Sequence, residues 1–262
     1  MIYKLYAFLF ARKTFFKLNR FLFKLSIHGL GLRNSSNQYL SGENAFIKNL
    51  IKLDAFKNGV ILDVGANIGD YSIFIRENGV IAPIFAFEPH PETYQQLISN
   101  TKNLNLTQFN LGLGEATFET VIFDYKKNNG SQHASIYKEV IEDIHKSEAI
   151  ETKISITTLD TIVEKYNIEQ ISLLKIDTEG NELSVIKGAS KTIAASKINY
   201  IQLEFNEMNI ISHTFLRDFI RLLPNYKFYR LLPTEMLEIK EYTPLYHELF
   251  AFQNIIAVKN NV

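Results

Sequence analysis

The sequence predicts an α/β fold built on a mostly parallel sheet, with a basic amphipathic helix before it. From residue 60 onward, short apolar runs alternate with segments of helical period, and the connections are long enough for right-handed crossovers. A glycine-containing turn follows the first run, and acidic residues follow several others, so polar groups should gather at one edge of the sheet. These observations predict one main α/β domain in a chain of 262 residues.

The N-terminal segment should be a separate basic helix. Over residues 8–25, apolar residues recur at spacings of three or four, with lysine and arginine on roughly the opposite face. No acid occurs before Glu43. Such a helix docks on its own domain, binds an anionic membrane surface, or binds a protein partner. We divide the chain into residues 1–40, the helical segment with a turn-rich linker, and residues 41–262, the main domain.

The main domain should alternate strands and helices, with an insert in its middle. After residue 114 we expect two short strands, 117–124 and 153–157, which enclose a polar loop at 126–135 and a short charged helix at 140–149. The other expected strands are 60–64, 84–87, 107–111, 171–176, 200–205, 227–232 and 250–258, and the other expected helices are 43–56, 70–78, 91–103, 182–195 and 214–223.

Composition excludes several functional classes. Lys plus Arg and Asp plus Glu both number 28, and this balance argues against a general nucleic-acid binder. The absence of cysteine excludes a disulfide scaffold, a thiolate zinc site and a cysteine nucleophile. No apolar run is long enough to predict a transmembrane helix. We expect a cytoplasmic protein, with peripheral contact of residues 1–26 on the inner face of the membrane as a further hypothesis.

The turn after the first predicted strand indicates a ligand site. Residues 60–71 read VILDVGANIGDY, in which the strand ends near Asp63 and leads through Gly65 and Gly69 into a helix. Glycines in such a turn let backbone amides and the helix N-terminus approach a ligand. Dinucleotide sites use a second glycine to admit a pyrophosphate, and here that position is Asn67. The turn therefore suits a ligand without phosphates, such as the methionine part of S-adenosylmethionine.

The next predicted strand ends in Glu88, about 20 residues beyond the glycines. A carboxylate there can accept hydrogen bonds from both ribose hydroxyls of an adenosine. A nicotinamide-dependent oxidoreductase would use the same sheet and stays an alternative, although the second loop glycine is missing. A non-catalytic, membrane-associated scaffold of a glycan-assembly complex is another alternative.

Several segments resemble FkbM-type methyltransferases. In order, they are DVGANIGDYS, FAFEPHPE, NLGLG, TTLDTI, ISLLKIDTEGNELSVIKGA and IQLEFN, and the resemblance covers about residues 29–258. It implies a Rossmann-like class I methyltransferase fold with a mostly parallel seven-stranded sheet whose last strand is antiparallel. It also implies S-adenosylmethionine as methyl donor and O-methylation of a hydroxyl, on acceptors that are diverse and include sugars of glycans and natural products.

The resemblance further implies roles for individual residues. Glu88 would hold the ribose, Asn110 and Leu111 would contact the adenine, and Asp177 would lie beside the sulfonium. The residues expected at the cofactor are Asp63, Gly65, Asn67, Gly69, Asp70, Tyr71, Glu88, Asn110, Leu111 and Asp177.

Methyl transfer to a hydroxyl requires an aligned oxygen and removal of its proton, by a general base or by a metal. Two neighbouring predicted strands end in Asp177 with Glu179 and in Glu204 with Asn206, so these oxygens should converge. They suit a divalent cation such as magnesium, or they cap helices, bind substrate hydroxyls or act as bases. Without a metal, Asp177 or Glu204 could take the proton, and His133 in the polar loop is another candidate base.

The sequence therefore predicts an S-adenosylmethionine-dependent O-methyltransferase that acts on a hydroxyl of a sugar or glycan-type acceptor. The basic N-terminal helix motivates the further hypothesis that this acceptor is lipid-linked.

Overall fold

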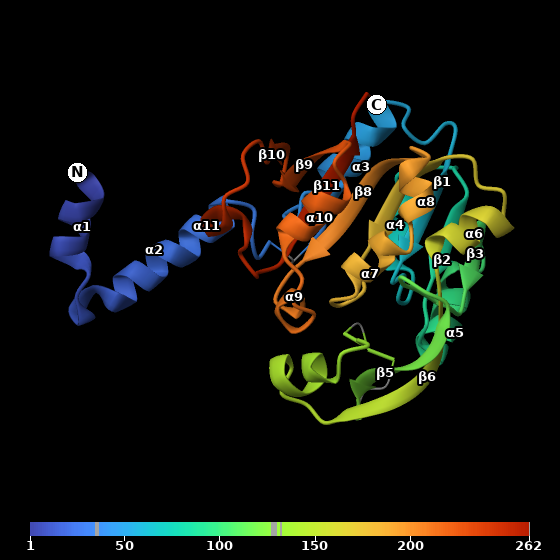
Figure 1. Cartoon of the computed structure of the whole chain (residues 1–262), viewed down its shortest axis with the longest axis horizontal. Helices are drawn as coiled ribbons and strands as arrows, with labels where there is room; N and C mark the ends of the chain where they lie inside the picture. The colour runs from blue at the N-terminus through green and yellow to red at the C-terminus, as the bar shows by residue number, and fades with distance from the viewer. Residues whose placement is uncertain (35–36, 127–129, 132, 262) are drawn as a thin grey trace.

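The computed structural model describes residues 1–34, 37–126, 130–131 and 133–261. Helices cover both faces of a central sheet, and a smaller second sheet lies below it in Figure 1. A helical arm at the N-terminus extends away from this body (Figure 1).

The central sheet of the described residues contains eight strands. They are β1 (Val60–Val64), β2 (Ile84–Phe87), β3 (Leu106–Phe109), β7 (Ile171–Ile176), β8 (Ile198–Phe205), β9 (Tyr226–Leu231), β10 (Met236–Glu238) and β11 (Gln253–Lys259). Their order is β10-β9-β11-β8-β7-β1-β2-β3, in which β8, β7, β1, β2 and β3 are parallel and β11 is antiparallel to both neighbours. The predicted α/β class and antiparallel last strand are confirmed. The expected seven strands become eight because β10 pairs with β9 at the edge.

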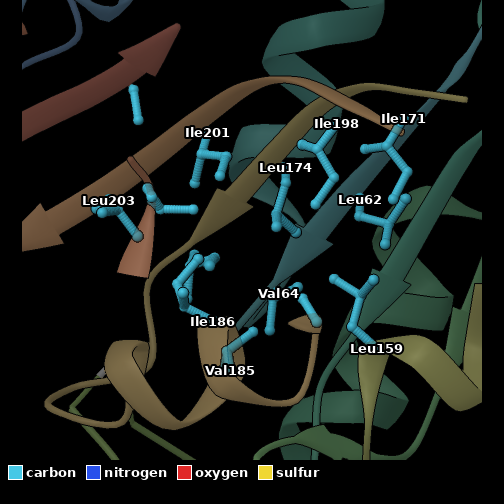
Figure 2. Close-up of a cluster of buried hydrophobic side chains, with 14 of the residues drawn as sticks. Leu62, Val64, Leu159, Ile171, Leu174, Val185, Ile186, Ile198, Ile201 and Leu203 are labelled. Carbon is cyan, nitrogen blue, oxygen red and sulfur yellow. The ribbon is translucent and has the colours of Figure 1, made fainter. Parts of the chain in front are cut away.

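The two central strands, β1 and β7, are buried on both faces of the sheet. Successive apolar side chains point to opposite faces, and each face is covered by a hydrophobic cluster. Leu62 and Leu174 are register partners, and they point into the cluster drawn in Figure 2 together with Ile186. Ile61 and its partner Leu173 belong to the cluster on the other face. Continuous apolar runs are typical of strands in a parallel sheet covered by helices on both sides.

Helices pack on the two faces through their apolar stripes. Phe46 and Phe74 belong to the cluster with Ile61, whereas Leu159 and Phe219 belong to the cluster with Leu62. The helices of the body are α3 (Glu43–Lys52), α4 (Asp70–Glu77), α5 (Pro91–Thr101), α6 (Leu159–Lys165), α7 (Glu182–Lys187), α8 (Ser190–Ala194), α9 (Met208–Ile211), α10 (Leu216–Leu222) and α11 (Pro244–His247).

The single helix expected over 182–195 is two helices, α7 and α8. At Gly188, between them, a Cβ atom would lie 1.9 Å from the carbonyl oxygen of Gly114. The backbone amides of Lys191 and Thr192 in α8 donate to the carboxylate of Asp160, at 2.9 Å each. The break therefore depends on contacts with distant segments, which the helical period cannot show.

The insert forms a second sheet of β4 (Gly112–Leu113), β6 (Ala149–Thr157) and β5 (Phe118–Tyr125), in that order. The helix expected over 140–149 is only a short π-helical turn, Val140–Ile144, because Ala149 already pairs with Tyr125 in the sheet. Of the polar loop expected at 126–135, residues 127–129 and 132 lie outside the described residues.

The N-terminal arm, residues 1–29, is bent rather than one helix over 8–25. It contains α1 (Ile2–Phe10), a 3-10 turn at Lys13–Phe15 and α2 (Phe16–Gly29). The backbone is extended at Arg12, and the side chain of Asn19 donates to the carbonyl oxygen of Phe10 at 2.9 Å. The Tyr6 hydroxyl donates to the same asparagine at 2.6 Å. The Asn19 amide stabilises the bend because it donates to the carbonyl at the end of α1, and the Tyr6 hydroxyl holds the Asn19 side chain in place.

The arm is attached to the body only at its root. Of the described residues in α1, the 3-10 turn and α2, only Ile27 is buried. Leu32, just beyond the arm, is fully buried, and the backbone amide of Arg33 donates to the carbonyl oxygen of Phe252 at 2.7 Å. The arm therefore does not dock along its own domain.

The turn between β1 and α4 is set by two glycines with positive φ. At Gly65, with φ +78°, a Cβ atom would lie 1.7 Å from the carbonyl oxygen of Asp177. At Gly69, with φ +97°, it would contact Thr101 and Leu97 of α5 at 2.8 and 2.9 Å. Both glycines therefore permit close approach of other protein segments, a role the sequence interpretation had given to a ligand.

We predict that Gly65→Ala lowers the free energy of unfolding by about 3 kcal/mol, from left-handed strain plus overpacking. Gly79→Ala is a matched control, since Gly79 has φ +81° but open space around a Cβ, and it should cost only about 1 kcal/mol. Urea unfolding of both variants measures the difference. Equal losses would show that the approach to Asp177 is not the constraint.

Candidate active site

A cavity of about 630 Å³ lies at the carboxyl ends of the parallel strands, between the two sheets. Its wall consists of the segments that follow β1, β2, β7 and β8, together with side chains from the second sheet. Small-molecule sites typically have volumes of about 300–1,000 Å³. The position is the one expected for a ligand in an open α/β sheet.

Glu88 lies directly after β2 and is 6% exposed. Its two carboxylate oxygens accept backbone N–H groups from Asn67 at 2.9 Å and from His90 at 2.8 Å. Burial raises the pKa of Glu88 to about 7, even though these two hydrogen bonds act in the opposite direction. The carboxylate lines the cavity, with further lone pairs that could accept hydrogen bonds from a ligand.

Asn67 connects the β1 turn to the second sheet. It has φ +49°, a conformation that asparagine tolerates better than most residues, and its side-chain amide donates to the carbonyl oxygen of Ser131 at 3.2 Å. Ser131 is itself held by Asp124, a buried carboxylate at the end of β5 that accepts the backbone amides of Gly130 and Ser131 at 2.6 and 2.8 Å. Asn67, which stands where a dinucleotide-binding loop has its second glycine, thus joins two walls of the cavity.

The wall after β3 differs from the expectation. Asn110 turns back and donates to the carbonyl oxygens of Glu88 and Pro89, both at 2.9 Å, and neither Asn110 nor Leu111 is among the described residues that line the cavity. Pro89, Gly112 and Ile156 line it instead. A Cβ atom at Gly112 would lie 2.4 Å from Ile156 Cδ1, so the Ile156 side chain packs directly against the backbone of Gly112.

A buried lysine lies at the base of the cavity. Lys175 Nζ is 3.0 Å from Asp177 Oδ2 and 3.6 Å from Asp63 Oδ1, and it lies 5.1 Å from the centre of the Tyr71 ring. Although burial acts to lower it, the charges of Asp177 and Asp63 raise the pKa of Lys175 above its ordinary value. Asp63 is fully buried, accepts from Ser72 at 2.7 Å and lies behind the wall.

A second polar chain runs from Tyr71 to α3. The Tyr71 hydroxyl donates to Gln202 at 2.7 Å, and the Gln202 amide donates to Glu43 at 2.8 Å. Burial raises the pKa of Glu43, which lines the cavity with Tyr71. The first acidic residue of the chain is therefore part of the site, although nothing in its sequence context indicates this.

The ends of β7 and β8 bring carboxylates together, as predicted. Asp177, Glu179 and Glu204 all line the cavity, and burial together with the charges of the other two raises the pKa of Glu204 well above its ordinary value. Asn206 donates to Glu204 at 2.5 Å, and its side-chain oxygen accepts the backbone amide of Met208, the first residue of α9, at 2.9 Å. Within the described residues, no group of three or more His, Cys, Asp or Glu side chains has a metal-binding arrangement, so the magnesium site lacks geometric support.

Glu182 holds the turn that carries these acids. One of its oxygens accepts the backbone amides of Thr178 and Gly180 at 2.9 and 3.0 Å, and the other accepts the side-chain amide of Asn209 at 3.2 Å. The turn contains Glu179 in a left-handed conformation, with φ +50°. The second glutamate of the DTEGNE segment is thus structural, which the sequence interpretation missed.

His133 approaches the cavity from the insert. Its Nδ1 is 3.2 Å from Glu179 Oε1, and the hydrogen bond with this carboxylate raises the pKa of His133. The ring of His145 lies 4.6 Å away between centroids, and burial, then the charge of His133, lowers the pKa of His145. The two imidazoles and Glu179 form one wall of the cavity.

Most of the predicted site residues therefore meet at one cavity. The predicted residues that line it are Gly65, Asn67, Asp70, Tyr71, Glu88, His133, Asp177, Glu179, Glu204 and Asn206. Asp63 and Gly69 lie behind the wall. The sequence interpretation missed Lys175, although a lysine inside the apolar run ISLLKI was a usable signal.

Comparison with known proteins gives a family match. The model of the Methyltransferase FkbM domain matches residues 63–229, which is more than half of the chain. The hexuronic acid methyltransferase AglP of Haloferax volcanii is 28% identical over 172 residues, 64% of this chain and 64% of that protein. Methyltransferase sdnD of Sordaria araneosa is 27% identical over 159 residues, 51% of this chain and 61% of that protein. The matches thus span less than two thirds of these curated relatives.

Among solved structures, an S-adenosylmethionine-dependent O-methyltransferase from Thermotoga maritima is 12% identical with a TM-score of 0.40. The superposition covers 83% of this chain and 64% of that one. At this score the fold assignment rests on the strand order itself.

The buried Glu88 predicts a pH dependence of stability. Its pKa of about 7 in the folded protein exceeds the ordinary 4.5, so the folded state binds the extra proton and stability falls as pH rises from 4.5 to 7. Glu88→Gln, which has no proton to lose, should make this decline smaller by about 3 kcal/mol. Urea unfolding of both proteins across this range measures it, and parallel curves would contradict the buried carboxyl.

Proposed function

Because this chain belongs to the FkbM methyltransferase family, we propose that it transfers the methyl group of S-adenosylmethionine to a hydroxyl of a sugar or glycan-type acceptor. The observation that carries this proposal is the buried Glu88 carboxylate on the cavity wall, beside the Asn67 turn. A carboxylate after the second strand can accept hydrogen bonds from both ribose hydroxyls of an adenosine. Similarity to the hexuronic acid methyltransferase of Haloferax volcanii supports a sugar acceptor.

The residues present fit S-adenosylmethionine, which supplies an electrophilic methyl group on a positively charged sulfur. Gly65 and Asn67 would hold the methionine end, and Glu88 would hold the ribose. The apolar side chain of Ile156 would pack against the adenine, in place of the expected Asn110 and Leu111. Carboxylates on the opposite wall complement a ligand of net positive charge.

The acceptor hydroxyl must lose its proton as its oxygen bonds to the methyl carbon and the carbon–sulfur bond breaks. We assign the base to His133, because Glu179 orients its ring and raises its pKa. The Asp177 carboxylate is engaged by Lys175 at 3.0 Å, and Glu204 accepts a hydrogen bond from Asn206. These two carboxylates would bind acceptor hydroxyls rather than take the proton. The products are a methyl ether and S-adenosylhomocysteine.

We also propose that residues 1–26 of the arm contact an anionic membrane surface. Large apolar side chains along the arm are exposed, with Ile2 and Phe8 each 73% exposed. Lysine and arginine occur throughout this segment, which has no acid. In the described part of the chain no helix has the length and apolar character needed to cross a bilayer. A bent, basic, apolar arm fits binding in the plane of the interface.

The root of the arm lies at the edge of the cavity. Arg33 hydrogen-bonds to the backbone of Phe252, and both Phe252 and Gln38 line the cavity. An arm held on a membrane would therefore keep the cavity close to the bilayer surface. This placement supports the proposal that the acceptor is lipid-linked.

For the donor site, we expect Glu88→Ala to weaken S-adenosylmethionine binding by about 1.5–3 kcal/mol, roughly a 10- to 150-fold rise in Kd. The exposed Glu77→Ala on α4 should leave the Kd unchanged. Calorimetry with S-adenosylmethionine and, separately, with NAD measures both affinities. A preference for NAD would overturn the methyltransferase assignment, and an unchanged Kd in Glu88→Ala would overturn the ribose contact.

For the arm, the triple variant Phe8→Ser, Phe16→Ser, Phe21→Ser should reduce binding to vesicles that contain anionic lipid by about 100-fold or more, since each buried phenylalanine contributes roughly 1.5–3 kcal/mol. These side chains are exposed, so the melting temperature should not change. Ile81→Ser is the control, because Ile81 is 92% exposed on the body. Vesicle sedimentation that treats all proteins alike would refute the membrane contact.

A further inference from the structure

We infer that Glu43, in the first turn of α3, binds the ammonium group of the methionine part of S-adenosylmethionine. This inference rests on the proposed methyl transfer and adds a donor-binding residue from the N-terminal side of the domain. Glu43 precedes the segment 63–229 that matches the family model, so the family match assigns it no role.

The carboxylate of Glu43 is held in place on the cavity wall. Glu43 is partly buried and lines the cavity, and the apolar stripe of its helix is buried through Phe46 and Ile47. Its Oε2 accepts the Ser41 hydroxyl at 2.9 Å, and its Oε1 accepts the Gln202 side-chain amide at 2.8 Å. Each oxygen of a carboxylate has a second lone pair. Glu43 therefore keeps acceptor capacity for a donor group on a ligand.

Glu43 has neutral hydrogen-bond partners and lacks a cation of its own. Among the described residues it forms no salt bridge, because the ammonium of Lys175 is engaged by Asp177 at 3.0 Å and Asp63 at 3.6 Å. Burial raises the pKa of Glu43, whereas its position at the start of a ten-residue helix favours the ionised form. A ligand ammonium would supply both N–H donors and the compensating charge.

The sheet register places Glu43 at a suitable distance from the ribose site. One register row crosses the sheet just before the strand ends, and its members on β2, β1, β7 and β8 are Ala86, Asp63, Lys175 and Gln202. Glu88 follows the β2 member of this row, and Glu43 is bonded to the β8 member. Three strand spacings, roughly 14 Å, therefore separate the two ends. In S-adenosylmethionine the sulfonium and a three-carbon chain separate the ribose from the ammonium, so one extended molecule can contact both carboxylates.

The two sides of Glu88 differ in polarity, and this difference orients the donor. On the β3 side the cavity wall contains Pro89, Gly112 and Ile156, which suit the flat, apolar faces of adenine. The methionine part must then extend in the other direction, across the β1 turn toward β7 and β8. Glu43 lies at that end of the cavity.

The same corner of the cavity suits the carboxylate of the methionine part. Tyr71, in the first turn of α4, donates to Gln202 at 2.7 Å, and Gln202 donates to Glu43, so the start of α4 lies close to Glu43. Backbone N–H groups at a helix N-terminus favour an anion. An amino acid with its ammonium at Glu43 and its carboxylate at α4 would thus meet opposite charges at both groups.

Other acids on the wall fit the ammonium less well. Asp177 already pairs with Lys175, and Asp70 is exposed, where solvent weakens an ion pair. Burial raises the pKa of Glu204 well above its ordinary value, which favours its neutral form. Glu43 combines a fixed carboxylate, a place on the wall and no competing cation among the described residues.

Two ligands that differ only at the amino group test the inference. S-adenosylhomocysteine has the ammonium, and 5′-S-(3-carboxypropyl)-5′-thioadenosine is the same molecule without it. Each is titrated into the whole chain at about pH 8, which favours an ionised Glu43, and calorimetry measures the Kd. We expect S-adenosylhomocysteine to bind about 10-fold more tightly than the analogue, because charge-assisted hydrogen bonds are the strong ones.

Glu43→Gln keeps the size of the side chain and removes its charge. It should weaken binding of S-adenosylhomocysteine and leave the Kd of the analogue unchanged, so that the preference falls to about threefold or less. Glu77→Gln, on the exposed face of α4, is the matched control and should keep the preference. Glu88→Ala should weaken both ligands alike, because both contain the ribose.

The Kd of the analogue and the melting temperature show whether Glu43→Gln is folded with an intact adenosine site. If this variant does not fold, Glu43→Asp takes its place. Glu43→Asp keeps the charge but withdraws the carboxylate by one methylene, and it should also reduce the preference.

The outcomes separate the two proposals. Failure of the wild-type protein to bind S-adenosylhomocysteine would contradict the proposed function. If it binds, equal affinity for the two ligands, or a preference that survives the substitution of Glu43, would overturn the ammonium contact alone. Loss of the preference in Asp70→Asn instead would assign the ammonium to α4 and would overturn the contact as well.

Discussion

The ion pairs of Lys175 hold the carboxyl ends of β1 and β7 together, and the cavity is built on them. Asp63 and Lys175 are register partners in the sheet, and Asp177 follows two residues later, so one ammonium lies between two carboxylates. A lone charge at the depth of Lys175 and Asp63 would be strongly unfavourable, so these two groups require each other, and the partly exposed Asp177 adds a second carboxylate. The same strand ends also meet through Gly65, whose missing side chain admits the carbonyl of Asp177. Together these contacts fix the floor of the cavity.

Above this floor, polar groups are positioned in two ways. Backbone amides orient Glu88 and Glu182, so these carboxylates hold turns in place as well as carrying charge. Glu179 and Glu204 instead point to the cavity with few partners, and burial raises the pKa of Glu179 to about 7. Glu182 therefore only shapes the site, whereas Glu88, Glu179 and Glu204 line the cavity and can meet a ligand.

Sequence patterns predicted the parts that depend on local order. The strands 60–64, 84–87 and 171–176 match β1, β2 and β7 because buried parallel strands are short apolar runs with turn residues at their ends. The bend in the arm and the break at Gly188 depend on contacts between distant residues, so a helical period could not show them. In the site, the acids at strand ends converge because parallel strands end at one edge. The role of Glu43 depends on Gln202, far along the chain, and had no local signal.

Asn67 makes hydrogen bonds to residues on two different walls of the cavity. Its backbone amide donates a hydrogen bond to the Glu88 carboxylate, and its side-chain amide donates one to the carbonyl oxygen of Ser131. A substitution at position 67 that preserved the backbone conformation but removed the side-chain amide would keep the hydrogen bond to Glu88 and lose the one to Ser131. A change in the insert that moves the Ser131 carbonyl would consequently remove a contact of the β1 turn as well, so the two halves of the cavity cannot change independently.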